Sequence, residues 1–212
     1  MRRQPKQVRA QITRQRLMNA LDSLLKERDF DLISVVEIAK EAGVSSGLLY
    51  SHFKNKADFL DALLEDYQAR IVARLETVEQ SDLMAEFKAA GGLREALREI
   101  AAFAYQQLSE DAHILRAIAH SLKSRSALER EDWQDIRLRA YDTIAPVLTV
   151  YETELARPND ETTAQMLVYF FNSIYLEELY RDPFQSMADD IGKDRFISEI
   201  ADFAYGYLTT PR

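Results

Sequence analysis

Hydrophobic residues recur along this chain at the three- and four-residue spacing of amphipathic α-helices. No segment alternates hydrophobic and polar residues as a half-buried strand would, and no hairpin dipeptide joins two such segments. We therefore expect an all-α fold. The predicted helices cover about residues 8–28, 35–41, 45–52, 55–79, 93–108, 114–122, 133–155, 160–181 and 193–208.

Polar residues mark the starts of three predicted helices. Ser34 and Glu37 form the Ser-x-x-Glu pattern, in which the serine caps the helix and the glutamate reaches back to the serine. Ser45 and Asn55 have side-chain oxygens that can cap the next two helices. Gly43, just after the first short helix, can take the positive φ that a tight turn needs. This segment therefore predicts two short helices joined by a tight turn and followed by a long helix.

Length and composition narrow the class of protein. A chain of 212 residues corresponds to one or two domains of about 150 residues. It has no cysteine, which excludes disulfides and thiolate chemistry. No run approaches the ~18 apolar residues of a membrane span, and the basic N-terminus is not followed by the apolar segment of a signal peptide. We expect a cytoplasmic protein with no membrane partner.

Charge is distributed unevenly along the chain, whose net charge is −8. Residues 1–60 contain 11 Lys and Arg against 7 Asp and Glu, whereas the rest of the chain contains 16 against 28. Six basic residues precede the first acidic residue, Asp22. A basic end on an acidic body favours contact between that end and a polyanion, although a solvated, disordered tail would carry the same charges.

Residues 34–60 read SVVEIAKEAGVSSGLLYSHFKNKADFL and combine two short helices with a glycine turn. This is the physical form of a helix-turn-helix, in which the second helix enters the major groove of DNA. The second helix offers short or hydrogen-bonding side chains and no acid, which suits that groove. Its candidate outer residues are Ser45, Ser46, Gly47, Leu48, Tyr50, Ser51 and His52.

The same segment resembles the signature of the TetR family of transcriptional regulators. The matching residues are Ile38, Ala39, Ala42, Gly43, Val44, Ser45, Gly47, Tyr50, His52, Phe53, Lys56 and Leu60. The resemblance implies an N-terminal three-helix helix-turn-helix DNA-binding domain at residues 8–55. A helical ligand-binding and dimerisation domain would then occupy residues 56–212.

The resemblance also implies roles for single residues on double-stranded DNA. Leu48 stands where the family often has threonine, so it either touches a thymine methyl group or only packs. His52 has a structural role as its alternative. Lys56 lies in the first turn of a long helix, whose free N–H groups attract phosphate. Phosphate contacts are expected from Ser34, Tyr50, His52 and Lys56, base-edge contacts from Ser45, Ser46 and Gly47, and a further DNA contact from Arg14 in the basic lead-in.

In the family, the second domain holds a ligand pocket and the dimer surface. This part of the chain is rich in aromatic residues, which suits an apolar or aromatic small-molecule effector. Packing in the core is the alternative for each aromatic residue. The pocket is predicted to include Phe103, Trp133, Tyr141 and Phe170.

The last two long helices are predicted to form the interface of a homodimer. Tyr169, Phe170 and Phe171 are consecutive on one helix and cannot all face inward. The last helix has small residues on one face, which allows another helix to approach closely. The predicted interface residues are Phe171, Ile197, Ile200, Ala201, Ala204 and Leu208.

These observations lead to one hypothesis and two alternatives. The hypothesis is a homodimeric repressor that binds a palindromic operator and is released by a small molecule. The first alternative is a DNA-binding protein of the same fold that responds to a protein partner. The second is an enzyme with an appended helix-turn-helix, but the chain has no Gly-rich phosphate loop and no G-x-S-x-G sequence. His113 and His120 are seven residues apart, whereas zinc-binding histidines on one helix are usually four apart. We expect no catalysis, no cofactor and no metal.

Overall fold

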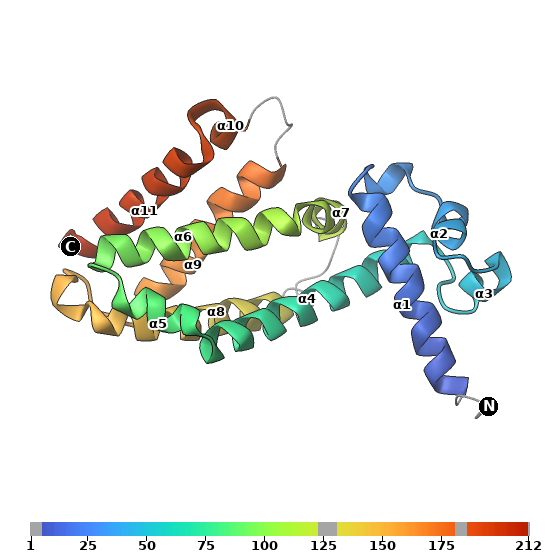
Figure 1. The fold of residues 1–212 in the computed structure, drawn as a ribbon, viewed down its shortest axis with the longest axis horizontal. Coiled ribbons are helices and arrows are strands. Elements are labelled where there is room, and N and C mark those ends of the chain that lie inside the picture. The colour runs from blue at the N-terminus through green and yellow to red at the C-terminus, as the bar shows by residue number, and fades with distance from the viewer. Residues whose placement is uncertain (1–5, 123–130, 181–185, 212) are drawn as a thin grey trace. The chain divides into compact units, whose positions relative to one another are not determined.

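The computed structural model describes residues 6–122, 131–180 and 186–211, and the regular structure within these ranges is helical throughout (Figure 1). The predicted all-α fold is confirmed. The chain divides into two units, one of residues 1–69 and 113–125 and the other of residues 70–112 and 126–212. The functional domains expected at 8–55 and 56–212 stay a prediction. That residues 113–125 join the first unit is not visible in the hydrophobic pattern.

The first unit is built around α1, which packs on α2, while α2 packs on α3. Its core is formed by apolar side chains that are almost fully buried, Leu17, Leu21, Ile33, Ile38, Leu49, Phe59 and Leu63. The helix α4 is 25 residues long, or about 37 Å. It belongs to both units, because the boundary between them falls after residue 69. The elements are α1 (Lys6–Leu25), η1 (Phe30–Leu32), α2 (Val35–Glu41), α3 (Ser46–Tyr50), α4 (Lys56–Gln80) and α7 (Ala112–Leu122).

A tight turn separates α2 from α3. Gly43 has a φ of 63°, in the left-handed region. Its N–H donates to the carbonyl of Lys40 at 3.1 Å, and the N–H of Val44 donates to the carbonyl of Ala39 at 3.0 Å. These two bonds satisfy carbonyls that the helix end leaves free, in the pattern of a Schellman motif. The turn predicted at Gly43 is present.

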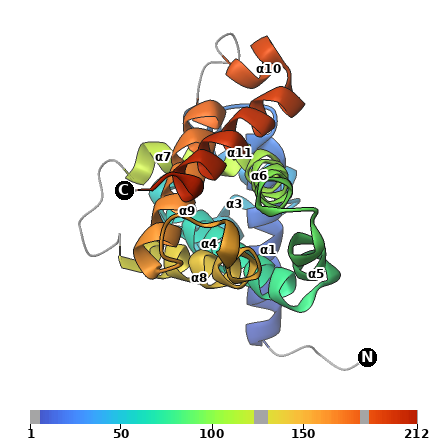
Figure 2. The ribbon, with the colours of Figure 1, turned by 90° about the vertical axis from the view of Figure 1, so that its left-hand side faces the viewer.

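In the second unit, α11 lies along α6, and α9 packs against both α6 and α8 (Figure 2). The short helix α5 packs against α6 and α8. Together these helices enclose an apolar core that includes Leu93, Leu97, Leu148, Ala164, Tyr175 and Leu208. The elements are α5 (Asp82–Ala89), α6 (Leu93–Glu110), α8 (Glu131–Val150), η3 (Glu152–Glu154), α9 (Glu161–Tyr180), α10 (Met187–Ile191) and α11 (Lys193–Thr209).

Two buried tyrosines connect helices within this core. The hydroxyl of Tyr175 donates to the carbonyl of Ala101 at 2.9 Å. The hydroxyl of Tyr151 donates to the carbonyls of Ala90 at 2.9 Å and Phe87 at 3.1 Å, where α5 ends. Burial raises the pKa of both phenols above its ordinary value. Each tyrosine is therefore a neutral donor that satisfies backbone carbonyls inside the core.

Most predicted helices are present, and the bounds of α2 agree with the prediction. The short helices α5 and α10 were not predicted. Pro146, for which a kink was predicted, lies inside α8, and the predicted end of α9 at Asp182-Pro183 lies outside the described residues. Among the described residues, no helix combines the length and hydropathy needed to cross a membrane.

We predict that Gly43→Ala lowers the melting temperature measured by circular dichroism. A Cβ at this position would have a left-handed φ and would lie 3.1 Å from Nη2 of Arg16. A non-glycine residue in that region costs about 1–3 kcal/mol. Gly206→Ala is the control, because it lies inside α11 and its Cβ would meet no atom within 4 Å. This control is expected to raise stability by up to about 1 kcal/mol. Equal melting temperatures for Gly43→Ala and the parent would contradict the prediction.

Candidate nucleic-acid interface

The helix α3 presents an acid-free surface to solvent. Ser45, Ser46, Gly47, Leu48 and Tyr50 are exposed, Leu48 by 42% and Tyr50 by 50%. On the inner side, Leu49 is only 1% exposed and anchors the helix in the core. The Oγ of Ser45 accepts the N–H of Leu48 at 3.3 Å, so it caps α3 as predicted. The five outer residues are those that the sequence assigned to base edges and phosphates.

Gly47 differs from Gly43 in what the fold requires of it. A Cβ built at Gly47 would meet no atom within 4 Å, and its φ is not in the left-handed region. Glycine inside a helix lowers stability by about 1 kcal/mol relative to alanine. Packing within the described residues therefore does not explain this glycine, whereas close approach of a partner's backbone to α3 does.

Ser34 forms the predicted capping box with Glu37. The N–H of Glu37 donates to Ser34 Oγ at 3.2 Å, and the N–H of Ser34 donates to Glu37 Oε2 at 2.8 Å. The backbone N–H of Ser34, its hydroxyl and then the Arg28 guanidinium lower the pKa of Glu37 to about 2. Since the Ser34 hydroxyl donates to Glu37 at 2.7 Å, a phosphate would have to compete with Glu37 for it. Its phosphate contact stays a prediction.

Lys56 is the first residue of α4, after the predicted cap residue Asn55. The Oδ1 of Asn55 accepts the N–H of Ala57 at 2.8 Å. The ammonium of Lys56 donates to the carbonyl of Asp31 at 3.0 Å and lies 4.5 Å from the ring centre of Phe30. These contacts use one of its three N–H donors and leave the ammonium at the edge of the unit, so it can still bind a phosphate. His52 is half-buried, and its role on DNA stays a prediction.

Two arginines of α1 have structural contacts. Arg14, predicted as a DNA contact, forms ion pairs with Glu65 at 3.3 Å and Asp66 at 3.5 Å on α4. Its charge is matched inside the unit, which makes it a weaker candidate for DNA than the sequence indicated. Arg16, which the sequence analysis did not single out, donates to the carbonyl of Ala42 at 2.7 Å and so stabilises the turn before α3.

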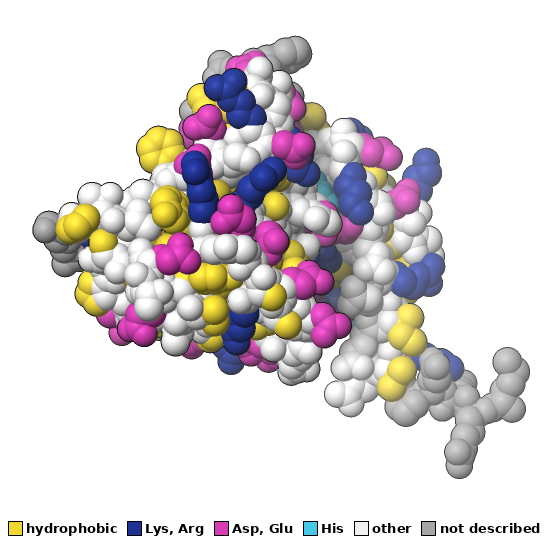
Figure 3. All heavy atoms as spheres, turned by 60° about the vertical axis from the view of Figure 1, so that its left-hand side comes forward, with side chains coloured by type: hydrophobic (Ala, Val, Ile, Leu, Met, Phe, Trp, Pro, Cys, Tyr) yellow, Lys and Arg dark blue, Asp and Glu magenta, His cyan; other side chains and the backbone are white. Residues whose placement is uncertain are grey.

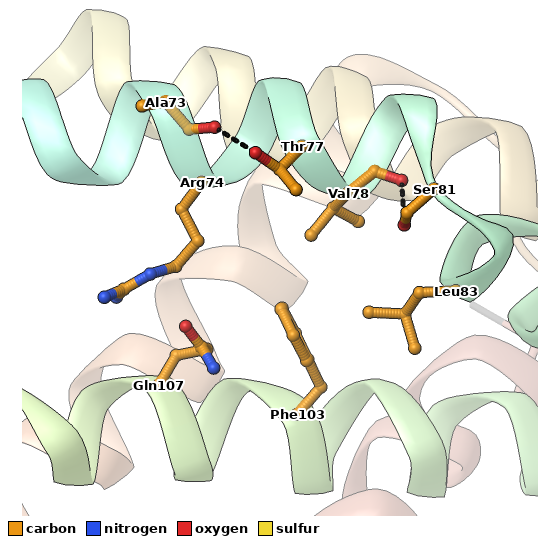
Figure 4. A pocket seen from close by; sticks show the side chains of 8 residues that line it. All are labelled: Ala73, Arg74, Thr77, Val78, Ser81, Leu83, Phe103 and Gln107. Atoms are coloured by element: carbon orange, nitrogen blue, oxygen red, sulfur yellow. Dashed lines mark hydrogen bonds between the residues drawn. The ribbon is translucent and has the colours of Figure 1, made fainter.

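The second unit contains an open pocket of about 400 Å³ between α4, α5 and α6 (Figure 4). Of the predicted pocket residues, Phe103 lines it. Tyr141 and Phe170 pack against the core cluster instead, and the side chain of Trp133 lies outside the described part. The lining residues are Ala73, Arg74, Thr77, Val78, Ser81, Leu83, Phe103 and Gln107. Its polar lining residues were not predicted, because residues 74–81 and Gln107 come together only in the folded chain.

The residues predicted for the dimer interface lie in the core of their own unit. Phe171, Ile197, Ile200, Ala201, Ala204 and Leu208 are each at most 5% exposed, because they face α6 and the core of their own unit. The apolar residues that α9 and α11 turn outward are Met166, Tyr169 and Phe203, which are 47%, 58% and 69% exposed. The two helices stay candidates for the interface, and their outward face is the one that solvent reaches. Figure 3 shows acidic, basic and hydrophobic side chains interspersed over the second unit.

Among the described residues, no three His, Cys, Asp or Glu side chains gather as metal ligands would. His113, weighed as half of a metal pair, instead has its Nε2 3.3 Å from Oδ1 of Asp22 on α1. The side chain of His120 lies outside the described part.

Comparison with known proteins agrees with this geometry. Residues 17–63 match the family model described as bacterial regulatory proteins of the tetR family. The transcriptional regulator UidR of Escherichia coli is 34% identical over 84 residues, which are 38% of this chain and 43% of that protein. A tetR-family regulatory protein from Rhodococcus RHA1 superposes with a TM-score of 0.61 at 15% identity, covering 94% of this chain and 98% of the other. FadR of Bacillus subtilis, crystallised with stearoyl-CoA, superposes with a TM-score of 0.54 at 20% identity, covering 93% and 98%.

An exposed, acid-free helix behind a tight turn, followed by a separate helical unit, defines a DNA-binding protein of the helix-turn-helix class. Residues 17–63 carry the DNA-binding domain of the TetR family of transcriptional regulators, and the chain as a whole shares the fold of a TetR-family structure. The match to the curated relative UidR covers 43% of the length of that protein.

We predict that Gly47→Ala separates DNA binding from folding. Its melting temperature should equal or exceed that of the parent, since alanine favours the helix by up to about 1 kcal/mol. Its affinity for a duplex selected from random sequence by the parent should fall about tenfold or more, because the new methyl group holds α3 off the DNA. Gly91→Ala is the matched control, since its Cβ also meets no atom within 4 Å but lies in the second unit. Unchanged affinity of Gly47→Ala would argue against α3 as the reading helix.

Proposed function

We propose that this protein is a homodimeric repressor that binds a palindromic operator and is released by a small-molecule effector. The observation that carries the proposal is the outer surface of α3. Packing would allow a larger residue than Gly47 on this surface. Its exposed neighbours are Ser45, Ser46, Leu48 and Tyr50. Such a surface matches a major groove in which side chains contact base edges and the backbone approaches closely.

Dimerisation is proposed through the outward face of α9 and α11. Phe170 and Phe203 have ring centres 6.3 Å apart, so the apolar residues of the two helices are continuous. Met166 and Tyr169 extend this face along α9. Exposed aromatic residues grouped on neighbouring helices are typical of an interaction surface, whereas isolated ones are common anywhere. Two-fold symmetry would place two copies of α3 on two half-sites.

Release is proposed to begin at the pocket beside α4. This helix runs without interruption from Lys56, at the helix-turn-helix, to residues 73–78 that line the pocket. A ligand that changes the separation of α4 and α6 across the pocket would therefore move the element that precedes Lys56. The likeness in fold to FadR, crystallised with stearoyl-CoA, supports a small molecule as effector. The pocket favours this proposal over control by a protein partner.

The first test is to select duplexes from random sequence with the purified protein. We expect a two-fold symmetric site to be enriched, because a dimer with two copies of α3 reads two half-sites. Enrichment of asymmetric sites, or of none, would contradict the proposed operator binding.

We predict that Lys56→Ala weakens binding to the selected duplex and reduces the dependence of log Kd on log salt by about one unit. The loss should be similar for matched and mismatched duplexes, since a phosphate contact carries no sequence information. Lys88→Ala, an exposed lysine of α5 in the second unit, is the control and should leave the slope unchanged. A parental salt slope for Lys56→Ala in gel-shift titrations would remove Lys56 from the interface.

We predict that Phe203→Glu converts the dimer into monomers in light scattering and weakens binding to the palindrome. Phe203 is 69% exposed, so the substitution does not introduce a charge into the core. Ala204→Glu would be uninformative, because Ala204 is buried in its own unit. Val150→Glu, at an apolar position 51% exposed at the end of α8, is the matched control and should remain dimeric. A dimeric Phe203→Glu variant would place the interface elsewhere.

A further inference from the structure

The pocket of the second unit has two chemically different ends. Figure 4 shows Arg74 and Gln107 at one end, extending toward each other from α4 and α6, with Phe103 and Leu83 toward the other end. Val78 adds to the apolar wall. A pocket of about 400 Å³ is large enough for a drug-sized molecule. Its lining therefore fits a ligand with one apolar part and one polar part.

The polar end has positive character. Nη1 of Arg74 lies 2.9 Å from Oδ2 of Asp111, and Nη1 of Arg70 lies 4.0 Å from the other carboxylate oxygen. Two guanidinium groups therefore share one carboxylate. The acids Glu76 and Glu79 of the same helix instead interact with Arg139 and Thr143 of α8. A guanidinium group in the lining of an open pocket, here that of Arg74, favours an anionic group.

The hydroxyl groups of the lining are already used as donors. Thr77 donates to the carbonyl of Ala73 at 2.8 Å, and Ser81 donates to the carbonyl of Val78 at 3.0 Å (Figure 4). Donors for an acid must therefore come from Arg74 and from the amide of Gln107. Arg74 has five N–H groups in a planar fork, which suits a carboxylate, sulfonate or phosphate.

We propose that this pocket binds an amphiphile with an acidic head group, and that the acid replaces Asp111 as the partner of Arg74. The apolar body of the ligand lies against Phe103, Leu83 and Val78. The assignment rests on the proposed function and narrows its effector from any apolar or aromatic molecule to an acidic one.

The exchange acts at a corner that leads directly to the DNA-binding unit. Asp111 is 5% exposed and ends α6, and α7 begins at the next residue. Two residues after Asp111, His113 contacts Asp22 of α1 at 3.3 Å. Asp22 also pairs with Lys26, four residues further along the chain, at 3.1 Å, whereas its contact with His113 joins this end of α1 to α7. A change in the partners of Asp111 therefore reaches α1 through two peptide bonds and the His113–Asp22 contact.

The test uses two fluorescent probes that share one ring system. Anilinonaphthalene sulfonate has an acidic group, and phenylnaphthylamine lacks it. For the full chain we expect the sulfonate to bind at one site per chain, about tenfold or more tightly than the neutral probe, since a hydrogen bond to a charged group contributes enough for that factor. Absence of sulfonate binding, or equal affinity for both probes, would overturn the proposal.

Variants assign this preference to the pocket. Arg74→Gln should remove the preference for the sulfonate and leave the affinity for phenylnaphthylamine within about twofold of the parent. Asp111→Asn should raise the affinity for the sulfonate, because it frees Arg74. The double variant with Arg74→Gln and Asp111→Asn carries neither charge, so it covers the case in which a single variant fails to fold. It should show no preference for the sulfonate over phenylnaphthylamine. Arg94→Gln, which breaks an exposed pair between Arg94 on α6 and Asp202 on α11, is the control. A retained preference in Arg74→Gln or the double variant would contradict the assignment.

The regulatory step has its own measurement. The sulfonate should lower the affinity of the parent for its selected duplex. His113→Phe keeps a ring but loses the contact with Asp22. It should bind the sulfonate as the parent does, but the sulfonate should lower its DNA affinity by a factor at least about threefold smaller than in the parent. A full response in His113→Phe would refute the route through the corner. Because probe binding is read without DNA, a wrong ligand class and a wrong DNA-binding function give different outcomes.

Discussion

The reading surface depends on the reversal of the chain at Gly43. Its positive φ allows the N–H groups after α2 to bond back into the last turn, and Arg16 of α1 donates to the carbonyl of Ala42 at 2.7 Å. The direction of α3 follows from these constraints, because only two residues separate Gly43 from Ser46, where α3 begins. Leu49 then fixes the rotation of α3 by inserting into the core. The outer face of α3 is thus determined by one glycine, one arginine and one leucine that do not belong to that face.

Polar residues around this turn stabilise the helix ends of the DNA-binding unit. Ser34, Ser45 and Asn55 each use a side-chain oxygen as a helix cap, a role that contributes about 1 kcal/mol. The folded pKa of Glu37 lies below its unfolded value, so its contribution is present above the unfolded value and is lost as pH falls toward about 2. The capping box is therefore intact at neutral pH. Preorganised caps keep the short helices α2 and α3 formed, so that DNA meets a surface that is already ordered.

The sequence predicted features that depend on neighbours along the chain. The bounds of α2 followed from Ser34 and Glu37, and the turn followed from Gly43, because caps and turns are decided within a few residues. The residues predicted for the dimer face lie in the core, because the richest apolar stripe of α11, which includes Ala204, is buried in its own unit. The outward face of α11 has fewer apolar residues, of which Phe203 is the most exposed. Hydrophobic periodicity therefore favours the buried face over this one. The polar end of the pocket was missed because Arg74 and Gln107 are neighbours only after α4 and α6 pack.

In the mechanism that we propose, Asp111 converts ligand binding at the pocket into a signal. A ligand that filled the pocket equally well in both states of the regulator would shift neither. A ligand acid that takes Arg74 leaves Asp111 buried, with the guanidinium of Arg70 at 4.0 Å in place of a contact at 2.9 Å. A buried carboxylate that loses a close partner is destabilised, so the proposed exchange favours a rearrangement of the corner between α6 and α7 in which Asp111 finds other donors. Part of the binding energy of the ligand is converted into this rearrangement, which lowers its affinity and changes the position of His113. In this proposal, the carboxylate of Asp111 pairs with Arg74 when no acid is bound, and its displacement by a ligand changes the contact between His113 and Asp22 of α1.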